Sequence, residues 1–168
     1  PPEKAVYGER MAEIKRQREV EEKKRKVEAR ERAAVIWKEA KPVGSHPYLS
    51  AKGVMAHGLR EHGDFLVLRV TDGCVVHSLQ FIDADGTKRF LPGGRKKGCY
   101  HSIGKPDEVL CICEGYATGS SIHEATGHAV AVAFDAGNLL PVAEALRTKY
   151  PDLKLILCAD DDTQGDCT

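Results

Sequence analysis

Acidic side chains come just after two short apolar runs in the last third of the chain. Glu114 follows the run 109–113, and Asp160 and Asp162 follow the run 153–159. The two aspartates are two positions apart, so in an extended segment their side chains point the same way. Clustered carboxylates repel one another unless protons or cations neutralise them, and oxygen-only ligands select hard cations such as Mg²⁺ or Mn²⁺. The pattern therefore predicts a divalent metal site built from Glu114, Asp160 and Asp162.

The elements that must position these acids alternate between strands and helices. The expected order is strand, helix, strand, helix, strand, at 109–113, 117–126, 129–134, 138–149 and 153–159. This alternation is typical of parallel βαβ units, in which ligands bind beyond the carboxyl ends of the strands. With the first and last strands as parallel neighbours, Glu114 and the aspartates would meet at one edge. The alternative interpretation is that these acids are only helix caps and loop carboxylates.

A basic stretch precedes the acidic segment. Six lysines and arginines fall within residues 86–105, together with His101, and Phe90 and Tyr100 are interleaved with them. Cations, flexible glycines and aromatic rings together suit a nucleotide or a single nucleic-acid strand. A metal site that handles phosphate also needs cations to hold the remaining phosphate charge. We expect five of these residues to bind nucleotide or nucleic acid: Lys88, Arg89, Arg95, Lys96 and Lys97.

Residues 42–106 as a whole have the pattern of a small, mostly antiparallel β subdomain. Short strand-like runs at 65–70, 74–82 and 88–91 are separated by turn signals, and Asp85-Gly86 predicts a hairpin. Before this unit, residues 1–41 are dominated by Glu, Lys and Arg, and four Glu-to-Lys/Arg pairs at i,i+4 favour a long helix. We expect a solvated linker helix whose end docks through Val35, Ile36 and Trp37. A nucleic-acid-binding arm is the alternative.

Composition limits the class of protein. The 168 residues have zero formal net charge, but residues 1–40, 41–106 and 107–168 carry +3, +5 and −8. No apolar run approaches the roughly 20 residues that a membrane span needs. The six cysteines form no C-x-x-C pair, so we expect reduced thiols in a cytoplasmic protein without membrane contact. The start, Pro1-Pro2, has neither a Met nor a signal peptide, which predicts a piece of a longer protein.

Two motifs resemble the signatures of the Toprim family. Leu110-Cys-Ile-Cys-Glu-Gly-Tyr-Ala-Thr-Gly119 is similar to the first, and Leu155-Ile-Leu-Cys-Ala-Asp-Asp-Asp-Thr-Gln-Gly165 to the second. The family includes bacterial-type primases, topoisomerases, RecR proteins and OLD nucleases. From about residue 37 onward, the motifs His46-Pro-Tyr-Leu49, Phe90-Leu-Pro-Gly-Gly-Arg95 and Gly98-Cys-Tyr-His101 also resemble plasmid- and phage-borne primases of the TraC type.

The resemblance implies an α/β fold with a Toprim-like parallel sheet and flanking helices over residues 107–168. It implies a DNA primase whose catalytic and metal-binding residues are Glu114, Asp160 and Asp162, with Mg²⁺ or Mn²⁺ as cofactor. The partners that it implies are a single-stranded DNA template, nucleoside triphosphates and a replicative helicase. Thr118 stands where many members have an aspartate, and the chain stops soon after the aspartates. We therefore expect a C-terminally truncated Toprim unit. One interpretation is that this piece is inactive on its own because the unit is incomplete.

Rival functions remain open at this point. A Toprim nuclease would use the same acids with water as the nucleophile. A topoisomerase would need a nucleophilic tyrosine in another domain, and a receiver-like signalling domain would carry paired aspartates after its first strand, where Glu114 stands here. A non-catalytic nucleic-acid-binding module, with the acids serving only structure, is the last alternative. Zinc held by Cys74, Cys99 and His101 is a weaker hypothesis, because scattered ligands lack a zinc-like spacing.

Overall fold

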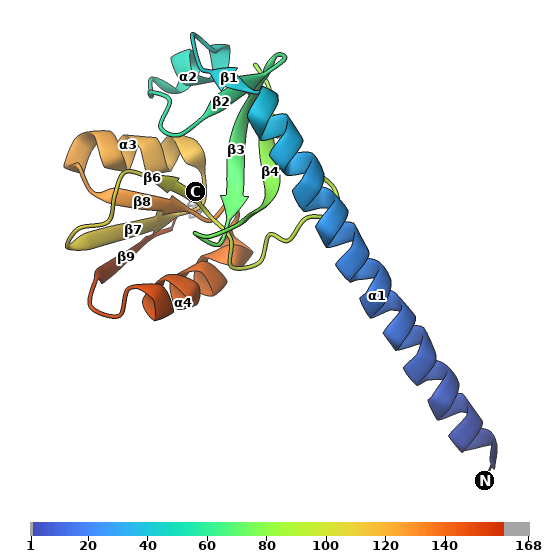
Figure 1. The fold of residues 1–168 in the computed structure, drawn as a ribbon. Coiled ribbons are helices and arrows are strands. Elements are labelled where there is room, and N and C mark those ends of the chain that lie inside the picture. Colours follow the sequence, from blue (N-terminus) through green and yellow to red (C-terminus); the bar gives the residue numbers. More distant parts are fainter. Residues whose placement is uncertain (1, 160–168) are drawn as a thin grey trace, which may run out of the picture.

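A computed structural model describes residues 2–159 and shows two β-sheets behind a long N-terminal helix (Figure 1). The helices are α1 (Pro2–Glu39), α2 (Pro47–Lys52), α3 (Tyr116–Thr126) and α4 (Leu139–Lys149), with a 3₁₀ turn η1 (Ala136–Asn138) before α4. The strands are β1 (Lys41–Pro42), β2 (Arg60–His62), β3 (Phe65–Thr71), β4 (Val76–Ile82), β5 (Lys88–Phe90), β6 (His101–Ile103), β7 (Val109–Cys113), β8 (Ala129–Val132) and β9 (Lys154–Cys158). The predicted α/β class is confirmed.

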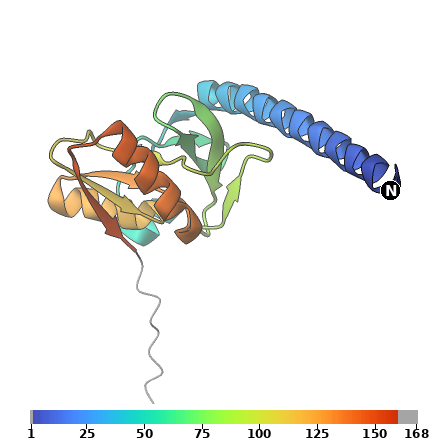
Figure 2. The same ribbon diagram turned by 90° about the horizontal axis from the view of Figure 1, so that it is seen from below.

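Helix α1 extends far from both sheets (Figures 1 and 2), and its residues 2–25 are almost all exposed. Ion pairs such as Glu22–Lys26 (2.5 Å) run along its surface, as the i,i+4 spacing predicted. Its last turns dock on the first sheet, because the small side chains of Ala29 and Ala33 let the helix approach closely.

The expected docking residues of α1 are only partly right. Ile36 and Trp37 pack against the core of the first sheet, and the guanidinium groups of Arg60 and Arg69 lie 4.4 and 4.9 Å from the centre of the Trp37 ring. Val35 is exposed instead, because it lies on the solvent side of the helix between the docking positions 33 and 36–37.

The first sheet is antiparallel throughout, in the order β1-β2-β3-β4-β5, which confirms the predicted β unit. The segment after α1 also forms the short helix α2, which lies in none of the predicted elements. His46 caps α2 by accepting the Tyr48 amide at Nδ1 (3.3 Å), Pro47 occupies the first turn, and Gly53 ends it in the left-handed region. Tyr48 and Leu49 then enter the core.

The second sheet has the order β6-β8-β7-β9, with β7 parallel to both β8 and β9. Helices α3 and α4 cover its opposite faces (Figures 1 and 2), because alternate residues of β7 point to opposite sides. Cys111 and Cys113 face α3, and Leu110 and Ile112 face α4. Strand β6 adds an antiparallel edge that periodicity did not predict.

One core cluster joins the two sheets. It contains Leu66 and Leu68 of β3 together with Ile103 of β6 and Val130 of β8. The predicted division at residue 106 therefore coincides with no break in the core, and the domain boundaries remain a prediction. The first sheet and the Toprim-like unit are packed closely enough to present a shared surface at the carboxyl ends of β7 and β8.

Candidate active site at the carboxyl edge of the second sheet

Strands β7, β8 and β9 end at the same edge of the sheet. Cys113 of β7 is in register with Val132 of β8 on one side and with Cys158 of β9 on the other. Glu114 follows β7 and is half-buried, and Ala159 follows β9. The predicted parallel pairing of the two acid-bearing strands is thus confirmed.

The metal set itself remains a prediction. Asp160 and Asp162 lie outside the described residues, so one of the three predicted ligands, Glu114, can be located. Within residues 2–159 no group of three or more His, Cys, Asp or Glu side chains is arranged to hold a metal ion. A half-buried carboxylate at a sheet edge is chemically suited to a hard cation, and completing the set would require the aspartates that follow β9.

Among the predicted cations, Lys88 lies beside Gly115, the residue that follows Glu114. It pairs with Ile82 across the β4–β5 hairpin, and its Nζ lies 3.5 Å from the point where a Gly115 side chain would begin. Asp83 fixes the turn of this hairpin by accepting the amides of Asp85 (3.0 Å) and Thr87 (2.9 Å). The hairpin therefore presents an ammonium group to the β7–α3 turn.

A groove of about 460 Å³ separates this hairpin from the start of α3. Its walls come from α2, the hairpin and α3, and its polar lining includes Tyr48, Lys52, Asp85, Lys88 and Thr118. The first amides of a helix carry partial positive charge, so the α3 end of the groove adds to the two lysines. The groove offers an anionic ligand a place beside Glu114.

Lys96 reaches the same edge from the loop between β5 and β6. Its Nζ makes an ion pair with Asp135 (2.5 Å) and lies 4.9 Å from the centre of the Phe90 ring. Phe90 packs edge-on against Phe134, with ring centroids 5.5 Å apart. Phe134 has a positive φ of 77°, a conformation that costs a non-glycine residue roughly 1–3 kcal/mol and is often found at functional sites.

Asp135 is an acid at this edge that was not among the predicted site residues. It lies just beyond the carboxyl end of β8, next to β7 in the sheet, and is half-exposed. The signal was present, because Asp135 follows a predicted strand as directly as Glu114 does. The same rule of strand ends would have added it to the candidate acids.

The other three predicted cations point elsewhere. Arg89 lies on the opposite face of β5, with its guanidinium 5.4 Å from the Phe65 ring. Arg95 lies 3.6 Å from Asp72 and donates to the Lys97 carbonyl (3.1 Å). Lys97 is exposed on the side of the loop that faces α1 and α4. The basic stretch is therefore divided between the carboxyl edge and other surfaces.

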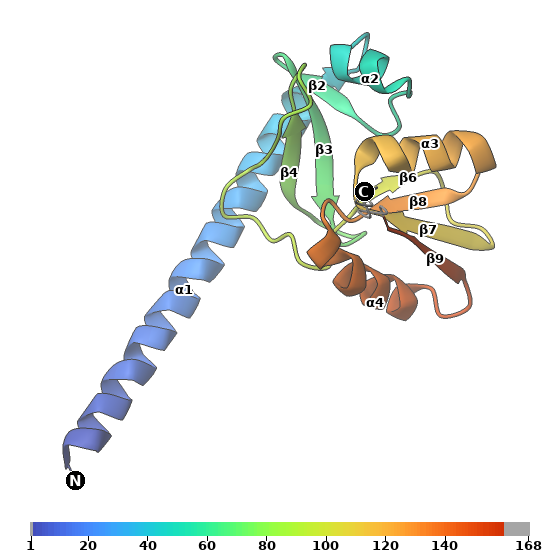
Figure 3. The ribbon, with the colours of Figure 1, turned by 180° about the vertical axis from the view of Figure 1, so that it is seen from behind.

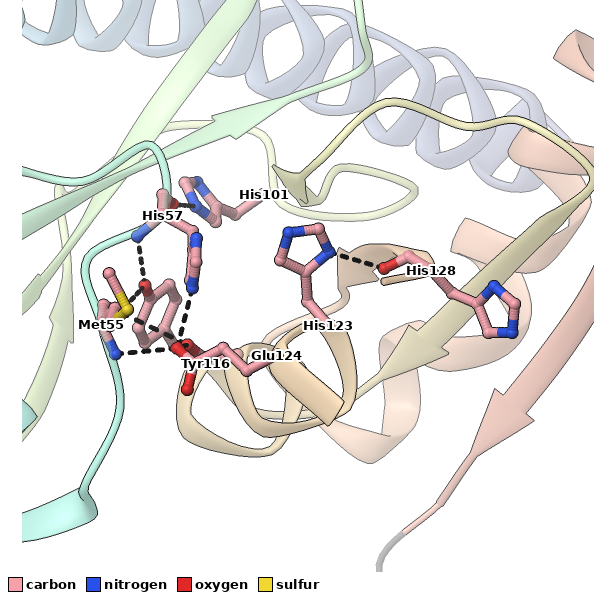
Figure 4. A network of polar contacts seen from close by, with 8 residues as sticks. Met55, His57, His101, Tyr116, His123, Glu124 and His128 are labelled. Atoms are coloured by element: carbon pink, nitrogen blue, oxygen red, sulfur yellow. Dashed lines mark hydrogen bonds and ion pairs between the residues drawn. The ribbon is translucent and has the colours of Figure 1, made fainter. Parts of the chain in front are cut away.

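A polar network fastens the α2–β2 loop to α3 (Figure 4). The Tyr116 hydroxyl donates to the Met55 carbonyl (2.7 Å) and accepts the His57 amide (2.6 Å). Glu124 accepts from the Met55 amide (2.9 Å), and its Oε1 lies 2.8 Å from His57 Nε2. The Met55 amide, His57 and Ser120 together lower the pKa of Glu124 to about 2. This network orients α3, whose first residues line the groove.

The zinc hypothesis fails on burial. Cys74 is exposed whereas Cys99 and His101 are buried, and His101 Nε2 already lies 2.9 Å from the His57 carbonyl, so these three do not form the zinc site considered above. Burial also raises the pKa of the Cys99 thiol to about 11, which disfavours a reactive thiolate.

None of the helices within residues 2–159 is long and apolar enough to cross a membrane.

Comparison with known proteins identifies close relatives. A model of the Toprim domain matches residues 108–168. One Escherichia coli protein named DNA primase TraC is 41% identical over 131 residues, covering 73% of this chain, and another of the same name is 38% identical over 170 residues, covering 95%. The chain spans 12% of the length of each of these relatives. No solved structure matches it significantly.

Proposed function

Because residues 108–168 match the Toprim domain and nearly the whole chain is similar to a segment of TraC-type DNA primases, we propose that it forms part of a primase active site. The observation that carries the proposal is the junction at the carboxyl edge of the second sheet. Glu114 leaves β7 there, Asp160 follows the parallel neighbour β9 in the sequence, and Lys88 reaches the adjoining turn.

The proposed reaction is nucleotidyl transfer on a single-stranded DNA template. The 3′-hydroxyl oxygen of one nucleotide attacks the α-phosphorus of an incoming nucleoside triphosphate, and the bond to pyrophosphate breaks. Glu114 accepts the hydroxyl proton, which a carboxylate at this edge is suited to do. Lys88 and Lys52 hold phosphate oxygens in the groove.

Mg²⁺ or Mn²⁺, held by Asp160 and Asp162, and by Glu114 where it does not serve as the base, would neutralise charge on the attacking and leaving oxygens. Lys96 is proposed to act at the same edge, beyond the end of β8. Its ion pair with Asp135 holds it near the edge, so a phosphate could compete with Asp135 for the ammonium group. The proposal includes a cytoplasmic location and a replicative helicase as partner, since a primase works on unwound DNA.

The proposal is tested in a hybrid primase. The aligned segment of an Escherichia coli DNA primase TraC is replaced by this chain, and the hybrid is given single-stranded DNA, labelled nucleotides and Mg²⁺ or Mn²⁺. Short primers are expected from the hybrid, and their loss is expected with Glu114→Gln, with Asp160→Asn and after chelation of the metal. Glu108→Gln, an exposed carboxylate before β7, is the matched control and should leave synthesis unchanged.

Two outcomes would contradict the proposal. A folded hybrid that makes no primers but cuts DNA, with the cutting lost in Glu114→Gln, would assign the site to a nuclease. Primer synthesis that survives both substitutions would show that these acids are not part of the catalytic site.

A further inference from the structure

A second basic groove lies away from Glu114, between α1, the β5–β6 loop and α4. It has a volume of about 490 Å³ and is lined by Lys26, Arg95, Lys97, Gly98, Pro141, Glu144, Ala145 and Thr148. Figure 3 shows the loop running from α1 towards the start of α4. Three cations from two distant parts of the sequence thus line one open groove.

Side chain and backbone contacts on both sides hold this groove in shape. Arg32 of α1 donates to the Pro92 carbonyl (2.9 Å), and a Cβ on Gly93 would lie 3.4 Å from the Arg25 carbonyl oxygen. At the other end of the loop, the Gly98 amide donates to Asn138 Oδ1 (2.8 Å). The relative positions of Lys26 and Lys97 therefore follow from packing.

We propose that this groove binds the phosphodiester backbone of single-stranded nucleic acid, with α1 as one wall. The inference rests on the proposed function and adds a binding surface to it. Lys96 and Lys97 are neighbours that face opposite sides of the loop, one towards Asp135 at the carboxyl edge and one towards the groove. A strand that leaves the edge past Lys96 would therefore enter the groove.

The chemistry of the walls favours the backbone over the bases. Among the described residues that line the groove there is no aromatic ring on which a base could stack. Small residues such as Gly98 and Ala145 leave room for a sugar–phosphate chain, and Lys26, Arg95 and Lys97 supply the positive charge. Glu144 of α4 is the one carboxylate among the described residues that line the groove.

The test measures binding of a fluorescent oligo(dT) to the full chain by anisotropy, across a series of salt concentrations. EDTA is present and nucleotides are absent, so the result does not depend on primer synthesis. The variant is Lys26→Ala with Lys97→Ala, and the matched control is Lys38→Ala, an exposed lysine of α1 outside the groove. Each lost phosphate contact on a single strand lowers the salt slope by about 0.7, so the double variant should lower it by about 1.4.

Lys26→Arg with Lys97→Arg should retain the slope, because it retains both charges. The proposal is overturned by a wild-type slope in the alanine variant, by no binding to the wild-type chain, or by displacement of oligo(dT) by poly-glutamate at equal charge. The last result would assign the groove to an acidic protein. A catalytically dead hybrid with a normal salt slope would contradict the primase proposal alone.

Discussion

Asn138 holds the backbone of Gly98 against the second sheet with a fully satisfied side chain. Asn138 Oδ1 accepts the Gly98 amide (2.8 Å), and Nδ2 donates to the carbonyls of Cys99 (3.0 Å) and Ala133 (2.8 Å). Asn138 is buried, so water does not compete for these hydrogen bonds. One side chain from the β8–α4 connection thereby fixes the loop that carries Lys96 and Lys97.

Asn138→Ala should therefore destabilise the protein by about 3 kcal/mol, because it leaves the Gly98 amide and several carbonyls buried without partners. The measurement is urea unfolding at neutral pH. Asn138→Asp retains an acceptor for Gly98 but turns a carboxylate towards the carbonyls, so it should be no better tolerated. Asp152→Ala, at an exposed turn position, is the control. An equal loss of unfolding free energy in Asn138→Ala and Asp152→Ala would mean that the hydrogen bonds of Asn138 do not stabilise the protein.

Local pattern was enough to predict the strands and helices of the Toprim-like unit. The predicted runs 109–113 and 153–159 overlap β7 and β9, since buried parallel strands read as short apolar runs flanked by turn signals. Strand β6 escaped prediction because its three residues have no period of their own. It is defined by pairing with β8, for example Ser102 with Ala131.

The candidate site shows the same division between local and long-range information. Glu114 was placed correctly at a strand end, because that position follows from local pattern. The basic stretch looked uniform in the sequence, yet alternation along β5 sends Lys88 and Arg89 to opposite faces. The roles of Asp135 and Asn138 depend on partners about 40 residues away, Lys96 and Gly98, which spacing alone does not reveal.

The separation of Lys88 from Arg89 predicts different effects on activity. Lys88→Ala in the hybrid primase should reduce primer synthesis by about 10- to 100-fold, because it removes a cation next to the proposed phosphate position. Arg89→Ala should stay within about twofold, because Arg89 stacks on Phe65 on the other face. Initial rates at saturating template compare the two variants. Equal losses would mean that the charge of the stretch matters more than its geometry.

Gly119 lies where α3 packs closely against the second sheet, so we expect a larger side chain there to destabilise the protein. A Cβ at this position would lie 3.0 Å from both Cys113 Sγ and Val132 Cγ2, so these side chains or α3 would have to shift by a few tenths of an ångström to admit one. Gly119→Ala should lower the free energy of unfolding by about 1–2 kcal/mol, since overpacking outweighs the better helix propensity of alanine. Ser121→Ala, at an exposed position of α3, is the control, and it should stay within about 0.5 kcal/mol of wild type.

Because His101 is buried, we expect the protein to lose stability in mild acid. Burial lowers the pKa of His101 from 6.5 to about 4, so between these values the unfolded chain binds a proton that the folded chain does not. The free energy of unfolding should therefore fall by up to about 3 kcal/mol as the pH drops through this window.

Glu124 also lowers the stability of the protein as the pH falls, but over a lower pH range than His101. The pKa of Glu124 is lowered from 4.5 to about 2, so its contribution is present above pH 4.5 and is lost as the pH falls towards 2. Two variants, measured by urea unfolding between pH 7 and pH 3, distinguish the contribution of His101 from that of Glu124. His101→Gln, whose amide can still donate to the His57 carbonyl, should flatten the profile above pH 4.5 and leave the lower part unchanged, whereas Glu124→Gln should change the lower part alone. An unaltered profile above pH 4.5 in His101→Gln would mean that His101 takes up its proton in the folded chain as readily as in the unfolded one.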